Sequence, residues 1–228
     1  MKLVIFDLDD TLIDFAATRK IAHVKLAELL VQEGLDSEGY LKVCTEIDRA
    51  LFSRFEQGII TRSEYRAKRF AEPFERLGLS PRSGLVGQLN TLFMDCVNDR
   101  PLLHDDVWPT FERLRSQGLQ IAILTNGPSD GQRRKLKATG LGAAVDHIAI
   151  GEEIGVSKPQ AAAFHSVIER FGLQGGEALM VGDSPELDYD AAVKAGLQAM
   201  LLDRDGSRAA PHRQSIRSLH EMHERTPR

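Results

Sequence analysis

Three aspartates follow one another closely at the end of the first apolar segment of the chain. Residues 3–6 read LVIF, a pattern typical of a buried strand, and Asp7, Asp9 and Asp10 come directly after them. Burying an ionised carboxylate is costly unless a positive group lies beside it. Side chains two apart in an extended strand point the same way, so we expect Asp7 and Asp9 to share one site and Asp10 to face elsewhere.

Polar side chains also follow the later apolar segments that we predict to be strands. In chain order they are Thr125 and Asn126 at the end of residues 121–125, Lys158 after residues 147–150, and Asp183, Ser184 and Asp188 after residues 179–182. The carboxyl ends of parallel strands share one edge of a sheet, where ligands bind. We therefore expect these side chains to converge with Asp7 and Asp9.

Carboxylates that share a dry site need a cation between them. The candidates are Asp7, Asp9 and Asp183, and no histidine or cysteine accompanies them in these motifs. Hard oxygen ligands select Mg²⁺ over zinc or copper, and Mg²⁺ in proteins commonly takes one or two carboxylates and a substrate phosphate. The residues therefore predict a magnesium site at which one aspartate is left to react.

Strand and helix patterns alternate along most of the chain. The predicted strands are residues 3–6, 121–125, 147–150, 179–182 and 199–202, and the segments between the later ones have helical spacing. Such alternation indicates right-handed βαβ units and a parallel sheet. We predict an α/β, Rossmann-like core domain, formed by residues 1–14 and 101–228, with a five-stranded, mainly parallel sheet.

Residues 15–100 break the alternation and have helical patterns throughout. Further helices are expected over about 38–56, 61–78 and 82–98, after a first helix with one apolar face. That face comprises Ala17, Ile21, Val24, Ala27 and Val31. An all-helical insert between the first and second strands would lie at the ligand-binding edge of the sheet, so we predict a four-helix domain that acts as a lid, with an unrelated helical domain as the alternative.

The net charge and the cysteine content indicate which classes of binding partner and cellular setting to expect. The 228 residues carry a net charge of −4, which gives no electrostatic reason to expect nucleic acid or an anionic membrane. Two cysteines, Cys44 and Cys96, do not make a disulfide framework. Met1 leads straight into a short strand, so we expect no signal peptide and a cytoplasmic protein. The sequence leaves open whether it is a monomer or a homodimer.

At these residues the chain resembles the haloacid dehalogenase superfamily, a group dominated by magnesium-dependent phosphatases. DLDDTL resembles its first motif, LTNG its second, Lys158 in SKP its third and GDSPELD its fourth. The insert is similar to the family's helical cap of the first type. The stretches FEQGIITRSEYRAKRF and LTNGPSDGQRRKLKATGL resemble the branch of pyrimidine nucleotidases and N-acylneuraminate-9-phosphatases.

The resemblance implies a role for each of these residues. Asp7 is the nucleophile that forms an aspartyl-phosphate. Asp9 protonates the leaving oxygen, activates water and offers its backbone carbonyl to the metal; we expect it, crowded by like charges, to hold the proton. The remaining roles are phosphoryl binding by Thr125 and Lys158, a place near the leaving group for Asn126, metal binding by Asp183, and support from Thr11, Ser184 and Asp188.

The predicted activity is hydrolysis of a small soluble phosphomonoester, with a nucleoside monophosphate or sugar phosphate as first expectation. Phe15 is a candidate to stack on the base or sugar. Four arginines, of which we select Arg66, are candidates to bind a second anionic group: Arg54, Arg62, Arg66 and Arg69. The arginines have a plainer interpretation as solvent-facing helix charges.

Three alternatives stay open. A phosphosugar mutase would use the same residues and differ only in excluding water. A 2-haloacid dehalogenase resembles these enzymes but lacks an acidic residue two positions after the nucleophile, where this chain has Asp9. A receiver-like phosphoacceptor module also uses aspartates and Mg²⁺, but its acceptor follows the third strand and it has no helical insert.

Overall fold

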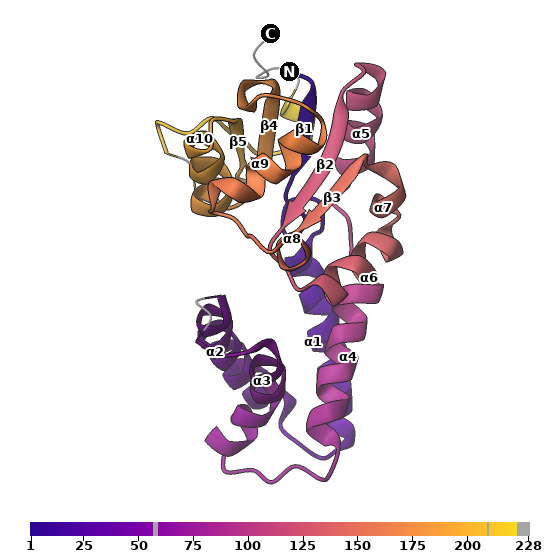
Figure 1. The fold of residues 1–228 in the computed structure, drawn as a ribbon. Coiled ribbons are helices and arrows are strands. Elements are labelled where there is room, and N and C mark those ends of the chain that lie inside the picture. Colours follow the sequence, from indigo (N-terminus) through magenta and orange to yellow (C-terminus); the bar gives the residue numbers. More distant parts are fainter. Residues whose placement is uncertain (57–58, 209, 223–228) are drawn as a thin grey trace. The chain divides into compact units, whose positions relative to one another are not determined.

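The computed structural model describes residues 1–56, 59–208 and 210–222, and the chain divides into two compact units (Figure 1). The core unit comprises Met1–Ala16 and Arg100–Arg228, and the helical unit comprises Ala17–Asp99. The sequence prediction placed these limits at residues 14/15 and 100/101. Each unit is described by itself below.

Over its described residues, the core unit contains one parallel sheet of six strands, in the order β3-β2-β1-β4-β5-β6. The strands are β1 (Leu3–Phe6), β2 (Gln120–Thr125), β3 (His147–Ile150), β4 (Ala178–Gly182), β5 (Gln198–Leu202) and β6 (Ser215–Ile216). In this order β1 pairs with β2 on one side and β4 on the other, so the carboxyl ends of these three strands lie together.

The α/β class and the mainly parallel sheet are confirmed, but the number of strands is not five. The additional strand, β6, has only two residues and pairs with β5 at the edge of the sheet. Two residues are too few to produce an apolar run or an alternation, so the sequence pattern gave no indication of it.

The alternation of β1 explains the two hydrophobic layers of the core unit. Val4 and Phe6 face the layer that contains α5 (Val107–Ser116), α6 (Ser129–Thr139) and α7 (Leu141–Ala144). Leu3 and Ile5 face the opposite layer, with α9 (Ala161–Arg170) and α10 (Ala191–Lys194). Because both faces are covered, all four residues of β1 are fully buried, as expected for a parallel strand (Figure 1). The shorter helical segments are α8 (Gly151–Ile154), η1 (Gly175–Glu177), η2 (Pro185–Asp190) and η3 (Leu219–Glu221).

Within residues 17–56 and 59–99, the helical unit consists of the body of α1 (Phe15–Gln32) and of α2 (Ser37–Glu56), α3 (Arg62–Arg76) and α4 (Leu85–Asp99). A capping box starts α3, because Thr61 accepts from the backbone N–H of Glu64 and Glu64 accepts from that of Thr61. Tyr40 on α2 is fully buried and donates to the carbonyl of Phe70 on α3 at 2.7 Å. No helix in the described part of the chain is long and apolar enough to cross a membrane.

The first helix buries a different face from the one predicted. The buried residues of α1 are Thr18, Ala22, Leu26 and Leu30, whereas Ile21, Val24 and Val31 are exposed. Apolar residues are distributed around the whole circumference of α1, so two faces fit a helical repeat equally well and the repeat alone could not choose between them.

Candidate active site

The end of β1 brings the first carboxylate to the edge of the sheet. The backbone N–H of Asp7 donates to the carbonyl of Val181 on β4 at 3.0 Å, so Asp7 continues the strand and its position is fixed by the sheet. Its side chain accepts a hydrogen bond from Nζ of Lys158 at 2.6 Å. The strand order thus brings residues 7 and 158 together although they are 151 positions apart.

Lys158 is shared between two buried carboxylates. Its ammonium also donates to Asp188 at 2.5 Å, and Asp188 in turn accepts from the backbone N–H of Ser184 at 2.9 Å. The Asp188 side chain packs over Gly182, where a Cβ atom would lie 2.2 Å from the Asp188 Oδ2 atom. Glycine at position 182 is therefore required to admit the carboxylate that holds Lys158.

Burial and crowding set the charge balance of this cluster. Burial raises the pKa of Asp7 well above its ordinary value, and the neighbouring Asp188 and Asp183 add to this effect while Lys158 opposes it. Burial also raises the pKa of Asp183, again with help from Asp188. Burial alone would lower the pKa of Lys158, but Asp188 and Asp7 outweigh it and raise that pKa. The positive charge near Asp7, Asp183 and Asp188 is therefore too small to balance three ionised carboxylates.

The carboxylates fit a divalent cation. One oxygen each from Asp7, Asp183 and Asp188 can be chosen such that all lie within 4.8 Å of one another. Oxygen donors alone, in a site with an excess of negative charge, are the donor set of Mg²⁺. Asp7 and Asp183 belong to the predicted set, and Asp188, predicted as a supporting residue, contributes the third carboxylate. The predicted contact of the Asp9 backbone carbonyl with the metal stays a prediction.

The carboxylate of Asp9 lies against a lysine that the sequence analysis did not select. Nζ of Lys135, on α6, contacts both Asp9 oxygens at 2.6 and 2.8 Å, and Nε2 of Gln132 donates to Asp9 at 2.9 Å. The carboxyl group of Asp9 therefore lies in direct contact with an ammonium group. Gln132 also donates to Oγ1 of Thr125 at 2.7 Å, so one amide connects Asp9 and Thr125.

Asn126 connects the end of β2 to the segment that carries Lys158. Its side-chain amide donates to the carbonyl of Lys158 at 2.7 Å, and its oxygen accepts from the backbone N–H of Lys158 at 2.9 Å. Both functions of the amide are therefore used to hold the backbone of Lys158. Asn126 thus positions Lys158, and its predicted place near the leaving group stays a prediction.

The supporting residues of the first loop make local contacts. Oγ1 of Thr11 donates to Asp183 at 3.5 Å, and the Thr11 carbonyl accepts from Arg204 at 3.0 Å. Asp10 adopts a left-handed backbone conformation, with φ of 60°, and accepts from the backbone N–H of Ala16 at 3.3 Å. Asp10 therefore stabilises the turn into α1, in agreement with its predicted orientation away from Asp7.

Two arginines outside the four motifs complete the network. Arg208 donates to the carboxylate and the carbonyl of Asp183 at 2.6 and 2.7 Å. Arg204 forms a double contact with Asp106 at 2.9 and 3.0 Å. Asp106 also accepts from the backbone N–H of Leu219 at 2.9 Å, so it joins three distant segments of the core unit. The sequence analysis did not predict a role for these arginines, because they follow β5 in an irregular segment that contains no motif.

The two substrate candidates lie on different helices. Phe15 is the first residue of α1, and its ring already faces the Lys135 ammonium, 4.8 Å from the ring centre. Arg66 is half-buried on α3 in the helical unit. Their assignment as substrate-binding residues stays a prediction.

Comparison with known proteins agrees with this arrangement of motifs. A model of the haloacid dehalogenase-like hydrolases matches residues 1–196 of the chain. The chain belongs to this family. The hydrolase is 30% identical to the ribulose-1,5-bisphosphate 5-phosphatase of Halopiger xanaduensis, over 98% of this chain and 97% of the relative. It is 28% identical to the pyrimidine 5'-nucleotidase YjjG of Escherichia coli, over 96% and 95% of the two chains.

Solved structures share the fold. The HAD-hydrolase YfnB from Bacillus subtilis, bound to magnesium, has a TM-score of 0.80 at 25% identity and covers 98% of this chain and 97% of its own. A 2-haloacid dehalogenase from Pseudomonas syringae, with a TM-score of 0.67 at 24% identity over 98% and 97%, resembles the hydrolase in fold alone. The family and its phosphatase relatives identify this hydrolase as a phosphatase.

Proposed function

We propose that the protein hydrolyses small soluble phosphomonoesters with Mg²⁺, through a covalent phosphoryl intermediate on Asp7. The observation that carries this proposal is the ion pair between Asp7 and Lys158 at the end of β1, with a second carboxylate pair, Asp183 and Asp188, within reach of one cation. Phosphatase relatives of nearly equal length support the reaction class.

In the first half-reaction, a carboxylate oxygen of Asp7 forms a bond to phosphorus while the bond from phosphorus to the ester oxygen breaks. A carboxylate attacks a phosphate dianion poorly until positive charge offsets their repulsion, which is the contribution of Lys158. Asp7, Asp183 and Asp188 would hold Mg²⁺, which would supply further positive charge at this position. Thr125, 2% exposed at the end of β2, offers its hydroxyl to a phosphoryl oxygen.

Asp9 supplies the proton for the departing alcohol. For this step its carboxyl group must be protonated, so it exchanges its ion pair with Lys135 for a contact with the leaving oxygen. In the second half-reaction a water oxygen bonds to phosphorus, the bond from phosphorus to Asp7 breaks, and Asp9 takes the proton of the water. Inorganic phosphate and the regenerated carboxylate of Asp7 result, so one acid–base residue serves both halves.

We further propose that the helical unit, Ala17–Asp99, acts as the cap that selects the substrate. It interrupts the core between β1 and β2, so both of its connections emerge near the loop that carries Asp9. A nucleoside monophosphate or sugar phosphate is the expected substrate, with Phe15 and Arg66 as candidate contacts.

A panel of phosphomonoesters tests the proposal. We expect Mg²⁺-dependent phosphate release that EDTA abolishes, and we expect Asp7→Asn to reduce it at least about 10³-fold, because no other group replaces the nucleophile. Asparagine keeps the shape of the side chain, so circular dichroism of the variant should match the parent protein. Undiminished hydrolysis by purified Asp7→Asn would overturn the nucleophile assignment. Halide release from a 2-haloacid, with no phosphoester turned over, would identify a dehalogenase instead.

A further inference from the structure

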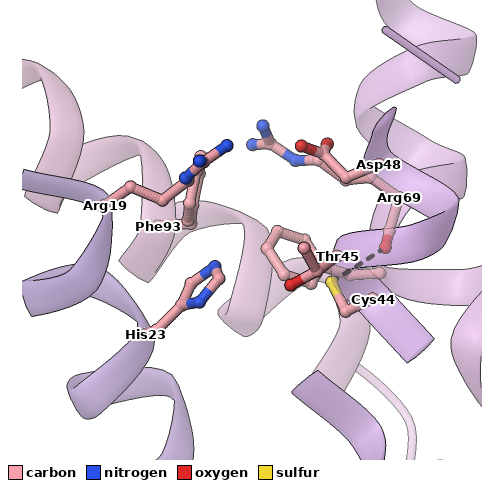
Figure 2. Close-up of a pocket in the computed structure, with 8 residues that line it drawn as sticks. Arg19, His23, Cys44, Thr45, Asp48, Arg69 and Phe93 are labelled. Carbon is pink, nitrogen blue, oxygen red and sulfur yellow. Dashed lines mark hydrogen bonds between the residues drawn. The ribbon is translucent and has the colours of Figure 1, made fainter. Parts of the chain in front are cut away.

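The helical unit contains a pocket of its own, which is small and open to solvent on one side (Figure 2). All four helices of the unit contribute to its lining: Arg19 and His23 from α1, Asp48 from α2, Arg69 from α3 and Phe93 from α4. A charged pocket inside a small helical unit is costly to maintain, because helix interiors are normally filled by apolar side chains.

Arg69 is the most buried charge of this pocket. It is only 3% exposed, and its guanidinium lies over the rings of Phe93, Phe70 and Tyr65 at 4.5, 5.0 and 5.4 Å. One terminal nitrogen donates to Asn90 at 2.7 Å. The Nε–H group finds no hydrogen-bond partner among the described residues, although it is buried. An unpaired buried donor costs about 1–3 kcal/mol, so its retention indicates a ligand.

A second guanidinium faces Arg69. In Figure 2 the head groups of Arg19 and Arg69 point towards one another across the pocket. Asp48 lies beside Arg69, but its carboxylate also accepts the hydroxyl of Tyr65 at 2.7 Å. The pocket thus contains two arginines against one aspartate. Burial, aided by Arg19, lowers the pKa of His23, so the imidazole is neutral at pH 7 and leaves this excess unchanged.

We propose that this pocket binds an oxyanion group, a carboxylate or a phosphate, between Arg19 and Arg69. Planar guanidinium groups bind such groups with paired, charge-assisted hydrogen bonds. Under the proposed function the helical unit selects the substrate, so we assign the oxyanion to the second anionic group of the phosphoester substrate. This assignment rests on the proposed function, whereas the anion site itself does not.

His23 provides a local probe of the anion site, since it is the only histidine of residues 17–99. Its ring resonances, identified with a His23→Gln variant, are followed by NMR during titration with inorganic phosphate and, separately, malonate. We expect a saturable shift in the parent protein and at least about a tenfold weaker response in Arg19→Gln. Arg49→Gln is the matched control, because it removes one exposed arginine from α2 outside the pocket lining. An unmoved His23, or equal responses in Arg19→Gln and the parent, would overturn the site.

Steady-state kinetics then test whether the bound oxyanion is part of the substrate. Phosphomonoesters are compared in pairs that differ only by a second carboxylate or phosphate group. We expect Arg19→Gln to raise KM about tenfold for the member with two anionic groups, and to leave KM unchanged for the other member and for both members in Arg49→Gln. Equal KM changes for both members would overturn the assignment to the substrate and leave a free anion as the ligand. Failure of every phosphoester to react would contradict the proposed function, while the NMR titration would still decide the anion site.

Discussion

The core unit and the helical unit both bury positive side chains, but these side chains have different partners. In the core unit Lys158 and Lys135 each make two contacts of 2.8 Å or less with carboxylates. In the helical unit the buried Arg69 has aromatic rings, one amide oxygen and a nitrogen with no partner among the described residues. Charges with close counter-charges hold a geometry in place, whereas a charge without its full set of partners is available to a ligand. We interpret the first arrangement as suited to catalysis and the second to recognition.

The largest effect that tests this interpretation is expected from Gln132→Leu in the core unit. The variant removes the amide that connects Asp9 with Thr125, so the proton donor and the phosphoryl ligand lose their common support. We expect kcat to fall about 100-fold for alkyl phosphates, because a displacement of about 1 Å at reacting groups has consequences of this size. The fall should be much smaller for p-nitrophenyl phosphate, whose leaving group departs without a proton.

Gln120→Leu is the control for this experiment. Gln120 is exposed at the opposite end of β2 from Thr125 and should leave both substrates unaffected. Equal losses with alkyl and p-nitrophenyl esters would show that Gln132 does not act through Asp9. A lower melting temperature of Gln132→Leu would point to a role in folding instead.

A smaller effect, on stability, is expected from Asp106→Asn. Burial would raise the pKa of Asp106, but hydrogen bonds from Arg204, Ser218 and the backbone of Leu219 outweigh it and lower the pKa from 3.8 to about 2. A carboxylate with a lowered pKa stabilises the folded state above pH 4, and this contribution is lost as the pH falls from about 4 to about 2. We expect Asp106→Asn to reduce the free energy of unfolding by about 2 kcal/mol at pH 7.

Urea denaturation at pH 7 and at about pH 2.5 measures this difference. The gap between the parent protein and Asp106→Asn should narrow at the lower pH. The exposed neighbour Asp105 provides the control, because Asp105→Asn removes the same charge without the same contacts. A gap that stayed constant with pH would mean that Asp106 acts by packing rather than by its charge.

The smallest effect is expected in the helical unit, in the titration of His23. Burial is the main cause of its lowered pKa, Arg19 adds to the lowering, and Asp48 opposes it. Arg19→Gln should therefore raise the pKa of His23, although not to its ordinary value of 6.5, and Asp48→Asn should lower it further. NMR pH titration of the His23 ring measures both changes. Shifts in the opposite directions would show that these side chains do not face the imidazole.

The two units also differ in how far their sequences predict them. The central strand β1 is fully buried, so Leu3–Phe6 is a continuous apolar run. Its limits, and those of His147–Ile150, were predicted without error. In the helical unit the helices were predicted to within about three residues, but the buried face of α1 was not. A helix that has apolar residues on every side does not reveal which side is packed, because only tertiary contacts decide it.

The candidate site shows the same division between residues within motifs and residues outside them. Asp7, Lys158 and Asp188 follow strands, and the strand order brings both carboxylates within hydrogen-bond distance of Lys158. Gln132 and Lys135 lie instead on α6, three residues apart. Charged residues on a helix ordinarily face solvent, so the sequence gave no reason to place them in the site. One signal was present: a glutamine and a lysine three apart lie on the same side of a helix that begins directly after the second motif.

The absence of a side chain at position 182 has a consequence for the whole cluster. The carboxylate of Asp188 occupies the volume that any larger residue there would claim, and the same carboxylate accepts from Lys158, which also donates to Asp7. A single added methyl group at the end of β4 would thus displace Asp188, and the displacement would pass through Lys158 to the carboxylate of Asp7. The position of this proposed nucleophile depends on the smallest amino acid in the sheet, which is far from it in sequence.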